Sequence, residues 1–342
     1  MSSQRLQAQS GPVVSPDGCY KLSQFETQVC QDLAQRATEL RAGAAPHTKP
    51  GKALGLLFLN PSLRTSASFQ RAAARLNLEL VNLNGQGVWA MESAEGAIMD
   101  GIKAEHLKDA AAVLGRYVDV LAVRAFPAGD DLEVDMADLV LRGFAKHSGV
   151  PIINMESTLW HPCQALADWA TLDQHHVPKR AKLVLTWAWH PKPLPHAVPN
   201  STLCMAAQRG MDVVVLHPPG YQLHPAVIEE AEQLTQSNGG TLRFSHDRKE
   251  ALHGAAVVYA KSWGSLDTWG HATAEKAQRA PLRDWCVTSR SMPQGAKFMH
   301  CLPVRRNVVV SDEVIDGPHS LVIEQAENRL HAQTALLEKI LS

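Results

Sequence analysis

The chain has 342 residues, enough for two domains of typical size. Hydrophobic residues make up 45% of it and charged residues 20%, which is typical of a folded globular protein and excludes a disordered chain. Lysine and arginine number 33 against 34 aspartates and glutamates, so the balanced charge argues against a broad nucleic-acid-binding surface. No apolar run reaches the roughly 18–20 residues of a membrane span, and the polar N-terminus lacks the apolar core of a signal peptide. Because the six cysteines form no paired spacing, we expect reduced thiols in a cytoplasmic protein.

Short apolar runs alternate with amphipathic stretches of helical period along the chain. The runs predict strands at Ala53–Leu59, Leu78–Leu83, Val118–Val123, Pro151–Asn154, Lys182–Trp187, Asp212–Leu216, Ala255–Ala260 and Lys297–His300. The stretches between them predict helices at Arg64–Leu76, His106–Leu114, Met136–Lys146, Pro162–Leu172, Ser201–Gln208 and Pro225–Leu234. This alternation predicts an α/β fold of parallel sheets with helices on both faces.

The domain organisation follows from composition. We expect residues 1–19 to form an N-terminal arm, and we place the boundary between two domains, 20–160 and 161–325, where the composition shifts. A strongly helical segment, 326–342, is expected to pack back on the first domain and complete it. The proline content of His190–Pro199 predicts a long loop there, directly after a strand. Since ligands of open α/β sheets bind beyond the carboxyl ends of the strands, the residues that follow each strand are the candidates for a site.

The first expected strand is followed by Asn60-Pro61-Ser62-Leu63-Arg64-Thr65, which opens a helix. Pro61 ends the strand and Ser62 is a favourable N-cap. The first helical turn then combines free N–H groups, hydroxyls and the Arg64 guanidinium, as in an anion site. The alternative is a plain N-cap beside a solvated arginine. No Walker or dinucleotide glycine motif is present, which argues against a nicotinamide-dependent oxidoreductase.

Polar or cationic residues also follow the later strands. Each has a structural alternative when taken alone, namely a rim salt bridge for an arginine and packing for a histidine. Their recurrence after nearly every strand is poorly explained by structure alone and favours a binding site. The residues are Arg124, Glu156, His161–Gln164, His190, Lys261 and His300–Asn307, with Arg329 in the last helix.

Four of these segments together resemble the ordered signature of the aspartate/ornithine carbamoyltransferases: Pro61–Thr65, Arg124, His161–Gln164 and His300–Pro303. The resemblance extends from residue 20 to the C-terminus. It implies two Rossmann-like parallel-sheet domains, one for carbamoyl phosphate and one for an amino acid, with the active site in the interdomain cleft. It also implies a homotrimer with active sites shared between subunits, and neither metal nor organic cofactor.

The resemblance assigns roles to individual residues. The carbamoyl-phosphate contacts are expected to be Ser62, Leu63, Arg64, Thr65, Leu302 and Arg329, together with Trp89 from the neighbouring subunit. The expected catalytic residues around the carbamoyl group are Arg124, His161, Gln164 and Cys301. Arg124 and His161 would stabilise the carbonyl oxygen as it becomes an oxyanion. Cys301 is expected to position the incoming amine, because the amine itself is the nucleophile.

The amino-acid side resembles one branch of the family. The chain lacks the Asp-x-x-x-Ser-Met-Gly loop with which ordinary ornithine enzymes bind a free α-ammonium. The segments Trp187–Leu194, Ala260–Trp263 and His300–Asn307 are instead similar to transcarbamylases that act on Nα-acylated ornithine. By that similarity the acylated amino acid is contacted by Glu156, His190, Lys261 and Arg305.

Ala104 bears on the acyl group, because the acetyl branch has a glutamate at this position and the succinyl branch a proline. A glutamate would face the second carboxylate of a succinyl group. Two like charges about 4 Å apart cost about 4 kcal/mol at an effective dielectric constant of about 20. Ala104 carries no charge, and Val309 replaces a lysine of the acetyl branch. We therefore expect Nα-succinylornithine as the substrate in arginine biosynthesis, with N-acetylornithine as the alternative.

One departure from the family concerns the phosphate motif, which usually ends Arg-Thr-Arg and here ends Arg64-Thr65-Ser66. Some members pair that last arginine with a glutamate four residues on, where this chain has Gln70. The two positions are neighbours on a helix, so an ion pair has been lost as a unit. A non-catalytic homologue is therefore a second alternative, although the catalytic residues are intact.

Overall fold

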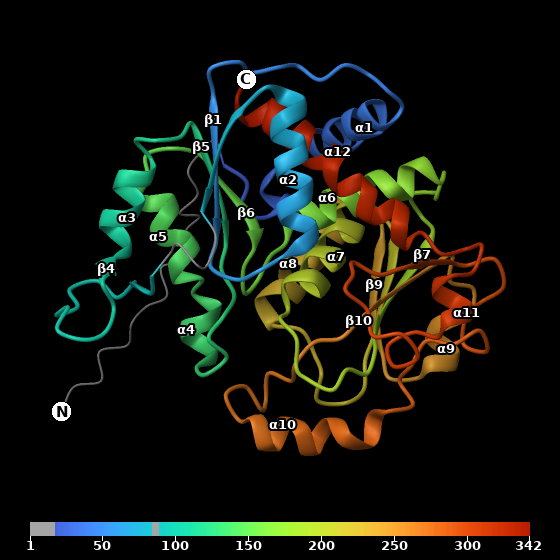
Figure 1. Ribbon diagram of the computed structural model, residues 1–342. Coiled ribbons are helices and arrows are strands. Elements are labelled where there is room, and N and C mark those ends of the chain that lie inside the picture. The colour runs from blue at the N-terminus through green and yellow to red at the C-terminus, as the bar shows by residue number, and fades with distance from the viewer. Residues whose placement is uncertain (1–17, 84–88) are drawn as a thin grey trace.

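The computed structural model describes residues 18–83 and 89–342, which form two parallel sheets flanked by helices (Figure 1). The first sheet has the order β2–β1–β5–β6, with strands Glu79–Leu83, Ala53–Phe58, Val120–Arg124 and Ile152–Glu156. The second has the order β11–β10–β7–β8–β9, with strands Lys297–Met299, Val257–Lys261, Lys182–Trp187, Asp212–Leu216 and Thr241–Ser245. A short parallel pair joins β3 (Met91–Glu92) to β4 (Glu105–His106). The expected α/β fold is confirmed.

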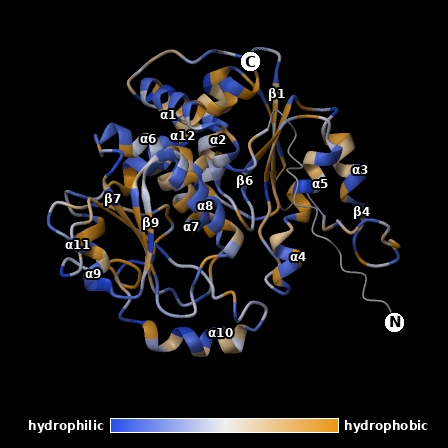
Figure 2. Ribbon diagram, turned by 180° about the vertical axis from the view of Figure 1, so that it is seen from behind, coloured by the Kyte–Doolittle hydropathy of each residue, from blue (hydrophilic) through white to orange (hydrophobic). Residues whose placement is uncertain are grey.

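Helices cover both sheets, and their outer faces are polar while the strands between them are apolar (Figure 2). Those of the first half are η1 (Leu22–Gln24), α1 (Thr27–Arg41), α2 (Leu63–Leu76), α3 (Leu107–Leu114), α4 (Leu132–Met136) and α5 (Leu139–His147). Those that follow are α6 (Pro162–Gln174), α7 (Ala197–Gln208), α8 (Pro225–Asn238), α9 (Arg248–Leu252), α10 (Ala272–Arg279), η2 (Ala280–Leu282), α11 (Asp312–Ile315) and α12 (Val322–Ile340). Within the described parts of the chain, no helix has the length and apolar character to cross a membrane.

Two helices connect the halves of the molecule. The helix α6 is buried along almost its whole length, because it runs between the sheets and packs on α1, α7 and α12. The last helix, α12, packs against α1, α2 and α6, so the C-terminal segment lies over elements of the first sheet (Figure 1). We propose that the domains divide at residues 160 and 161, because this point separates β6 of the first sheet from α6. The proposed arm falls largely on residues 1–17, outside the described part; its end, Cys19, forms a β-bridge with Ile153.

Two predicted elements are corrected. The helix expected at Met136–Lys146 is two helices, broken where Asp138 adopts a left-handed backbone with φ of 48°. The Asp138 carboxylate accepts hydrogen bonds from Tyr20 Oη and Ser157 Oγ, both at 2.6 Å, so the break is held by buried polar contacts. The loop expected at His190–Pro199 ends early because α7 begins at Ala197.

Other elements were missed. The helix α1 is rich in polar residues, and its buried stripe is short of large side chains. The strand β9 lies at the sheet edge and is mostly exposed, so its sequence lacks the apolar run that marks the central strands. Several strands also extend one or two residues past their expected ends, with the result that Arg124, Glu156 and Lys261 are the last residues of β5, β6 and β10.

Candidate active site

A cavity of about 510 Å³ lies where the carboxyl ends of strands from both sheets meet. Thirteen of the sixteen predicted site residues line it, in addition to apolar residues described below. They are Ser62, Leu63, Arg64, Thr65, Arg124, Glu156, His161, Gln164, His190, Lys261, Cys301, Leu302 and Arg329. Three predicted residues, Trp89, Ala104 and Arg305, do not line it.

The start of α2 forms one wall of the cavity. Ser62 has an extended backbone and caps the helix, since its Oγ accepts a hydrogen bond from the N–H of Thr65 at 3.4 Å. The positive end of the helix dipole and the Arg64 side chain therefore meet at the cavity, an arrangement that favours an anion. In the next turn Gln70 Nε2 donates to Ser66 Oγ at 2.8 Å, so the departure from the family motif leaves these two positions hydrogen-bonded.

Arg124 and Glu156 face each other across neighbouring strands. A register shift between Val123 and Arg124 sets Arg124 opposite Glu156, and Arg124 Nη1 donates to Glu156 Oε2 at 2.5 Å. The guanidinium also lies over the Phe126 ring, 4.4 Å from its centroid. Arg124 Nε is buried without a hydrogen-bond partner among the described residues. This guanidinium is thus fixed in place and retains a donor for a further group.

His161 begins α6 beside this pair. Burial, reinforced by the nearby cations Arg329 and Arg124, lowers the pKa of His161 well below its usual value. The imidazole is therefore neutral at neutral pH and carries one N–H donor. Its backbone is anchored by the Ser201 hydroxyl, which accepts from the His161 N–H at 2.7 Å. Its Nδ1 atom has no partner in the described part of the chain.

Arg329 joins the two walls of the cavity. Its Nη1 donates to Gln164 Oε1 at 2.9 Å, and its Nη2 donates to Thr65 Oγ1 at 3.1 Å. One guanidinium from α12 therefore ties α6 to the first turn of α2. Fork-shaped guanidinium contacts of this kind fix geometry as well as energy.

The opposite wall comes from the second sheet. Lys261 ends β10 and is 8% exposed, and Cys301 follows β11. Burial raises the pKa of the Cys301 thiol, so the sulfur is protonated at neutral pH and is a poor nucleophile. Glu156 is the one acidic residue that lines the cavity in the parts the structure describes.

Arg305 lies at the rim beside His190. Arg305 Nε donates to His190 Nε2 at 3.1 Å, and the other ring nitrogen lies 2.8 Å from the carbonyl oxygen of Lys192. Desolvation lowers the pKa of His190, in agreement with a neutral ring that accepts at Nε2. The structure thus brings Arg305 next to a cavity residue although Arg305 does not line the cavity itself.

Trp89 and Ala104 lie on a projecting segment that includes β3 and β4 (Figure 1). Trp89 Nε1 donates to Glu105 Oε2 at 2.8 Å, and Ala104 is exposed. The expectation that Ala104 contacts the substrate is therefore not met within one chain. The same segment exposes Ile98 by 85% and Ile102 by 100%, which is unusual for large apolar side chains.

The sequence analysis missed several apolar residues of the cavity. They are Phe126, Pro195 and Val198, whereas Leu194 and Pro303, which also line the cavity, fall inside segments that the sequence had singled out. Apolar side chains after a strand have no distinctive chemistry, so only their proximity in the chain to Arg124 and His190 could have suggested them.

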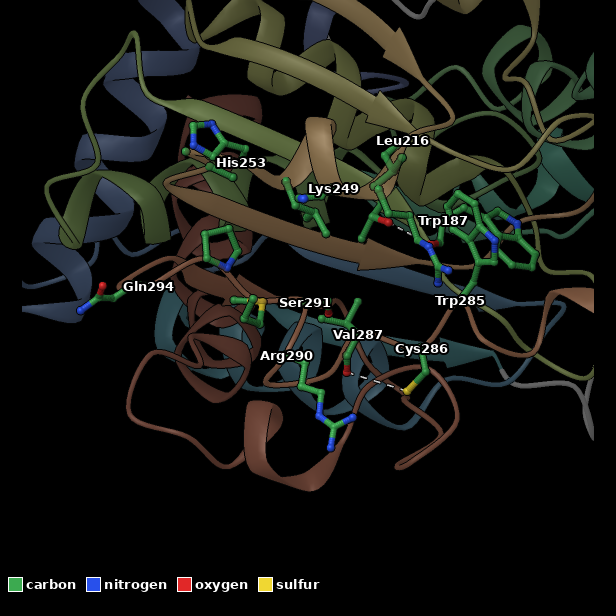
Figure 3. A pocket seen from close by; sticks show the side chains of 17 residues that line it. Trp187, Leu216, Lys249, His253, Trp285, Cys286, Val287, Arg290, Ser291 and Gln294 are labelled. Carbon is green, nitrogen blue, oxygen red and sulfur yellow. Dashed lines mark hydrogen bonds between the residues drawn. The ribbon is translucent and has the colours of Figure 1, made fainter.

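A second cavity of about 680 Å³ lies beside α9 and the segment 285–294 (Figure 3). It contains no predicted site residue. Its cations do not converge, because Arg248 is paired with Asp284 at 2.5 Å and Arg290 extends away from Trp187 and Trp285 (Figure 3). No candidate metal cluster of histidine, cysteine, aspartate and glutamate occurs in the described ranges.

The fold and the cleft define a two-domain α/β enzyme whose site combines an anion cradle with donors for a carbonyl group. Two family models match the chain: "Aspartate/ornithine carbamoyltransferase, carbamoyl-P binding domain" over residues 19–174 and "Aspartate/ornithine carbamoyltransferase, Asp/Orn binding domain" over residues 195–340. The chain belongs to the aspartate/ornithine carbamoyltransferase family.

Comparison with similar proteins indicates the branch of the family to which the chain belongs. The N-acetylornithine carbamoyltransferase of Xanthomonas axonopodis pv. citri is 46% identical over 85% of this chain and 87% of its own length. The N-succinylornithine carbamoyltransferase of Bacteroides fragilis is 39% identical over 85% of this chain and 87% of its own length. A glutamate-to-alanine variant of N-acetyl-L-ornithine transcarbamylase, complexed with carbamyl phosphate and N-succinyl-L-norvaline, has a TM-score of 0.90 and 42% identity, covering 93% of this chain and 98% of that one. The protein is a carbamoyltransferase of the N-acylornithine branch.

Proposed function

We propose that the protein transfers the carbamoyl group of carbamoyl phosphate to the δ-amine of Nα-succinylornithine, giving Nα-succinylcitrulline and phosphate. The observation that carries this proposal is the convergence, in one cleft, of the α2 anion cradle, the fixed Arg124 guanidinium and the buried Lys261. The uncharged Ala104 supports the succinyl substrate.

The geometry supports addition of the amine to the carbamoyl carbon, followed by loss of phosphate. The neutral δ-amine attacks, and the carbonyl oxygen gains negative charge that the unpaired donors of Arg124 and His161 stabilise. Arg64 and the N-terminus of α2 stabilise the phosphate as its bond to the carbamoyl carbon breaks, and the departing phosphate takes up the proton that the amine nitrogen loses. Glu156 accepts a hydrogen bond from the attacking amine and orients it, while the protonated Cys301 thiol shapes the pocket beside it.

The acyl group is proposed from charge. An alanine at position 104 removes the carboxylate that would repel a succinyl group. A solved relative that holds N-succinyl-L-norvaline is an acetylornithine enzyme in which a glutamate has been replaced by alanine. The higher identity to the acetylornithine enzyme of Xanthomonas favours the alternative substrate, N-acetylornithine. Lys261 and Arg305 are the cations available to the substrate carboxylates.

We further propose that the site is completed by a neighbouring copy in a homotrimer. Trp89 and Ala104 lie away from the cavity of their own chain, on a segment whose Ile98, Met99 and Ile102 side chains are exposed. Apolar side chains grouped in this way are typical of a surface that another chain covers. A neighbouring copy would bury them and bring Trp89 and Ala104 into its own cleft.

The substrate is tested by measuring citrulline-type product from carbamoyl phosphate with ornithine, N-acetylornithine and N-succinylornithine in parallel. We expect kcat/KM to be highest for N-succinylornithine. In Ala104→Glu we expect that preference to move toward N-acetylornithine by about 100-fold or more, since about 4 kcal/mol of repulsion is added. The matched control is Ala94→Glu, which places the same charge at another exposed alanine of the projecting segment.

The outcomes separate the alternatives. A parent enzyme that prefers N-acetylornithine, or an Ala104→Glu variant with unchanged preference, would overturn the charge argument. Turnover of none of the three amines would favour a non-catalytic homologue and direct attention to Ser66.

A further inference from the structure

Asp168 occupies α6 four residues after Gln164, on the same face of the helix. Its side chain is completely buried. Gln164 Nε2 and Gln325 Nε2 both donate to Asp168 Oδ1 at 2.7 Å. Neither the anion cradle nor the carbonyl donors described above include Asp168, and it does not line the cavity.

The two glutamines extend this contact in opposite directions. Gln164 presents its oxygen to Arg329, whose Nη1 donates to it at 2.9 Å. Gln325 presents its oxygen to the backbone N–H of His300 at 3.0 Å, where the loop after β11 begins. Asp168 thus links α6, which forms one wall of the cavity, to the loop after β11, which carries Cys301 and Leu302.

The carboxylate fixes which way both amides point. A glutamine amide has a donor at one end and an acceptor at the other, so an acceptor placed at Nε2 forces Oε1 to the opposite side. If Gln164 were flipped, its amide N–H groups would face the Arg329 N–H groups, donor against donor. In the observed orientation Gln164 Oε1 also has a second lone pair, which is available to the amide N–H of a carbamoyl group.

A contact that only held the two helices together would not need a buried carboxyl group. One turn further along the same two helices, Asn328 Nδ2 donates to Thr171 Oγ1 at 2.7 Å, a neutral contact that holds α6 to α12. Asp168 in contrast is costly to bury: desolvation raises its pKa to about 7, and Oδ2 has no partner among the described residues.

We propose that Asp168 is a positioning residue that orients the Gln164 amide toward the carbamoyl group and, through Gln325, holds the loop after β11 against the same cleft. This inference deepens the proposed function and rests on it, because it assigns a role in the same carbamoyl site.

Three variants test the proposal: Asp168→Leu, Asp168→Asn and, as matched control, Thr171→Val. Leucine removes the acceptor of the Gln164 amide and one of the two acceptors of the Gln325 amide, whose Nε2 also donates to Tyr259 Oη at 3.0 Å. We expect kcat to fall between about 10- and 100-fold, the range for residues that orient the ligands of a metal site. Asparagine keeps an acceptor oxygen but loses the charge, so kcat should fall only about fivefold. Thr171→Val removes the neutral tie between the same helices, and its kcat should stay within about twofold of the parent because it reaches no cleft residue.

Binding of carbamoyl phosphate, measured by calorimetry on the same proteins, gives a readout that does not require turnover. We expect the dissociation constant to rise about fivefold in Asp168→Leu and to be partly restored in Asp168→Asn. If the parent binds carbamoyl phosphate but turns over no amine, the proposed function fails while the binding series still decides the role of Asp168.

Two results would overturn the inference. One is equal loss of activity in Asp168→Leu and Thr171→Val, which would show that both residues only hold the helices together. The other is an Asp168→Asn variant with the kcat and binding of the parent, a result that also decides the matter should the leucine variant fail to fold. A parent that neither binds nor turns over carbamoyl phosphate would overturn the inference and the proposed function together.

Discussion

At the residue scale, the pairing of Arg124 with Glu156 links two functions that the cleft must combine. In the proposed mechanism the guanidinium is the donor for a developing oxyanion, and the carboxylate is the acceptor for an attacking amine. Their contact at 2.5 Å and the stacking of Arg124 on Phe126 hold both groups in place within the chain. Groups fixed before reaction stabilise charge at no reorganisation cost during it.

Replacing Arg124 with glutamine should therefore remove most of the activity. We expect kcat to fall about 100- to 1,000-fold, as for loss of one oxyanion donor, with the Glu156 carboxylate left without its partner. Steady-state kinetics of citrulline-type product formation measures the effect. The control is Arg180→Gln, which breaks a surface ion pair with Asp212, where Arg180 is 60% exposed. A kcat of Arg124→Gln within fivefold of the parent would show that the carbonyl site is assigned wrongly.

Also at this scale, residues with distinctive chemistry were the predictable part of the site. Arg64, Arg124, His161 and Lys261 each follow a predicted strand, and the structure places all four in one cavity. Phe126 and Asp168 escaped prediction for a physical reason. The first has an ordinary apolar side chain, and the role of the second depends on Gln325 of α12, which the sequence does not place next to Gln164 and Asp168.

At the element scale, two glycines lie where helices α3 and α5 pack closely against each other. A Cβ atom at Gly115, which caps α3, would lie 1.7 Å from the Ser148 carbonyl oxygen at the end of α5. A Cβ atom at Gly143 within α5 would lie 2.3 Å from Leu107 Cδ2. The first obstacle is backbone and the second is the end of a flexible side chain. The projecting segment leads straight into this pair of helices, because α3 follows β4 directly.

Alanine at these two glycines should have unequal effects. Gly115→Ala must push the α5 backbone away, and we expect it to lower the free energy of unfolding by about 3 kcal/mol. Gly143→Ala requires only a rotation of Leu107 and gains up to about 1 kcal/mol of helix propensity, so its net effect should be small. Urea unfolding followed by circular dichroism compares the two. Equal destabilisation would contradict the close backbone contact between α3 and α5.

Elements with apolar runs were predictable because a buried parallel strand must be apolar on both faces. The ends of the strands were harder to predict. The runs stop at Val123, Asn154 and Ala260, yet the ladders continue to the charged residues that follow. Pairing of the backbone, which the sequence does not display, extends each strand into the site and so determines where its last side chain lies.

At the scale of the whole molecule, one chain forms most of the cleft, but two residues expected in the site lie away from it. Trp89 and Ala104 lie on the projecting segment, whereas the cavity lies between the sheets. The sequence resemblance implies a shared site, to which a neighbouring chain would contribute Trp89. Because the isoleucines of the projecting segment are exposed, the oligomeric state is the measurement that tests a shared site.

Replacing Ile102 with aspartate should weaken the proposed trimer and its activity together. Ile102 is fully exposed in one chain, and burying such a side chain against a neighbour contributes about 2 kcal/mol at each interface. A charge there reverses that gain at every interface of a cyclic assembly. Sedimentation equilibrium should show a trimer for the parent and smaller species for Ile102→Asp, with kcat reduced in proportion to dissociation. Ile323→Asp, at another exposed isoleucine at 76%, should leave assembly and activity unchanged. A parent that is fully active as a monomer would refute the shared site and require Trp89 and Ala104 to act, if at all, within their own chain.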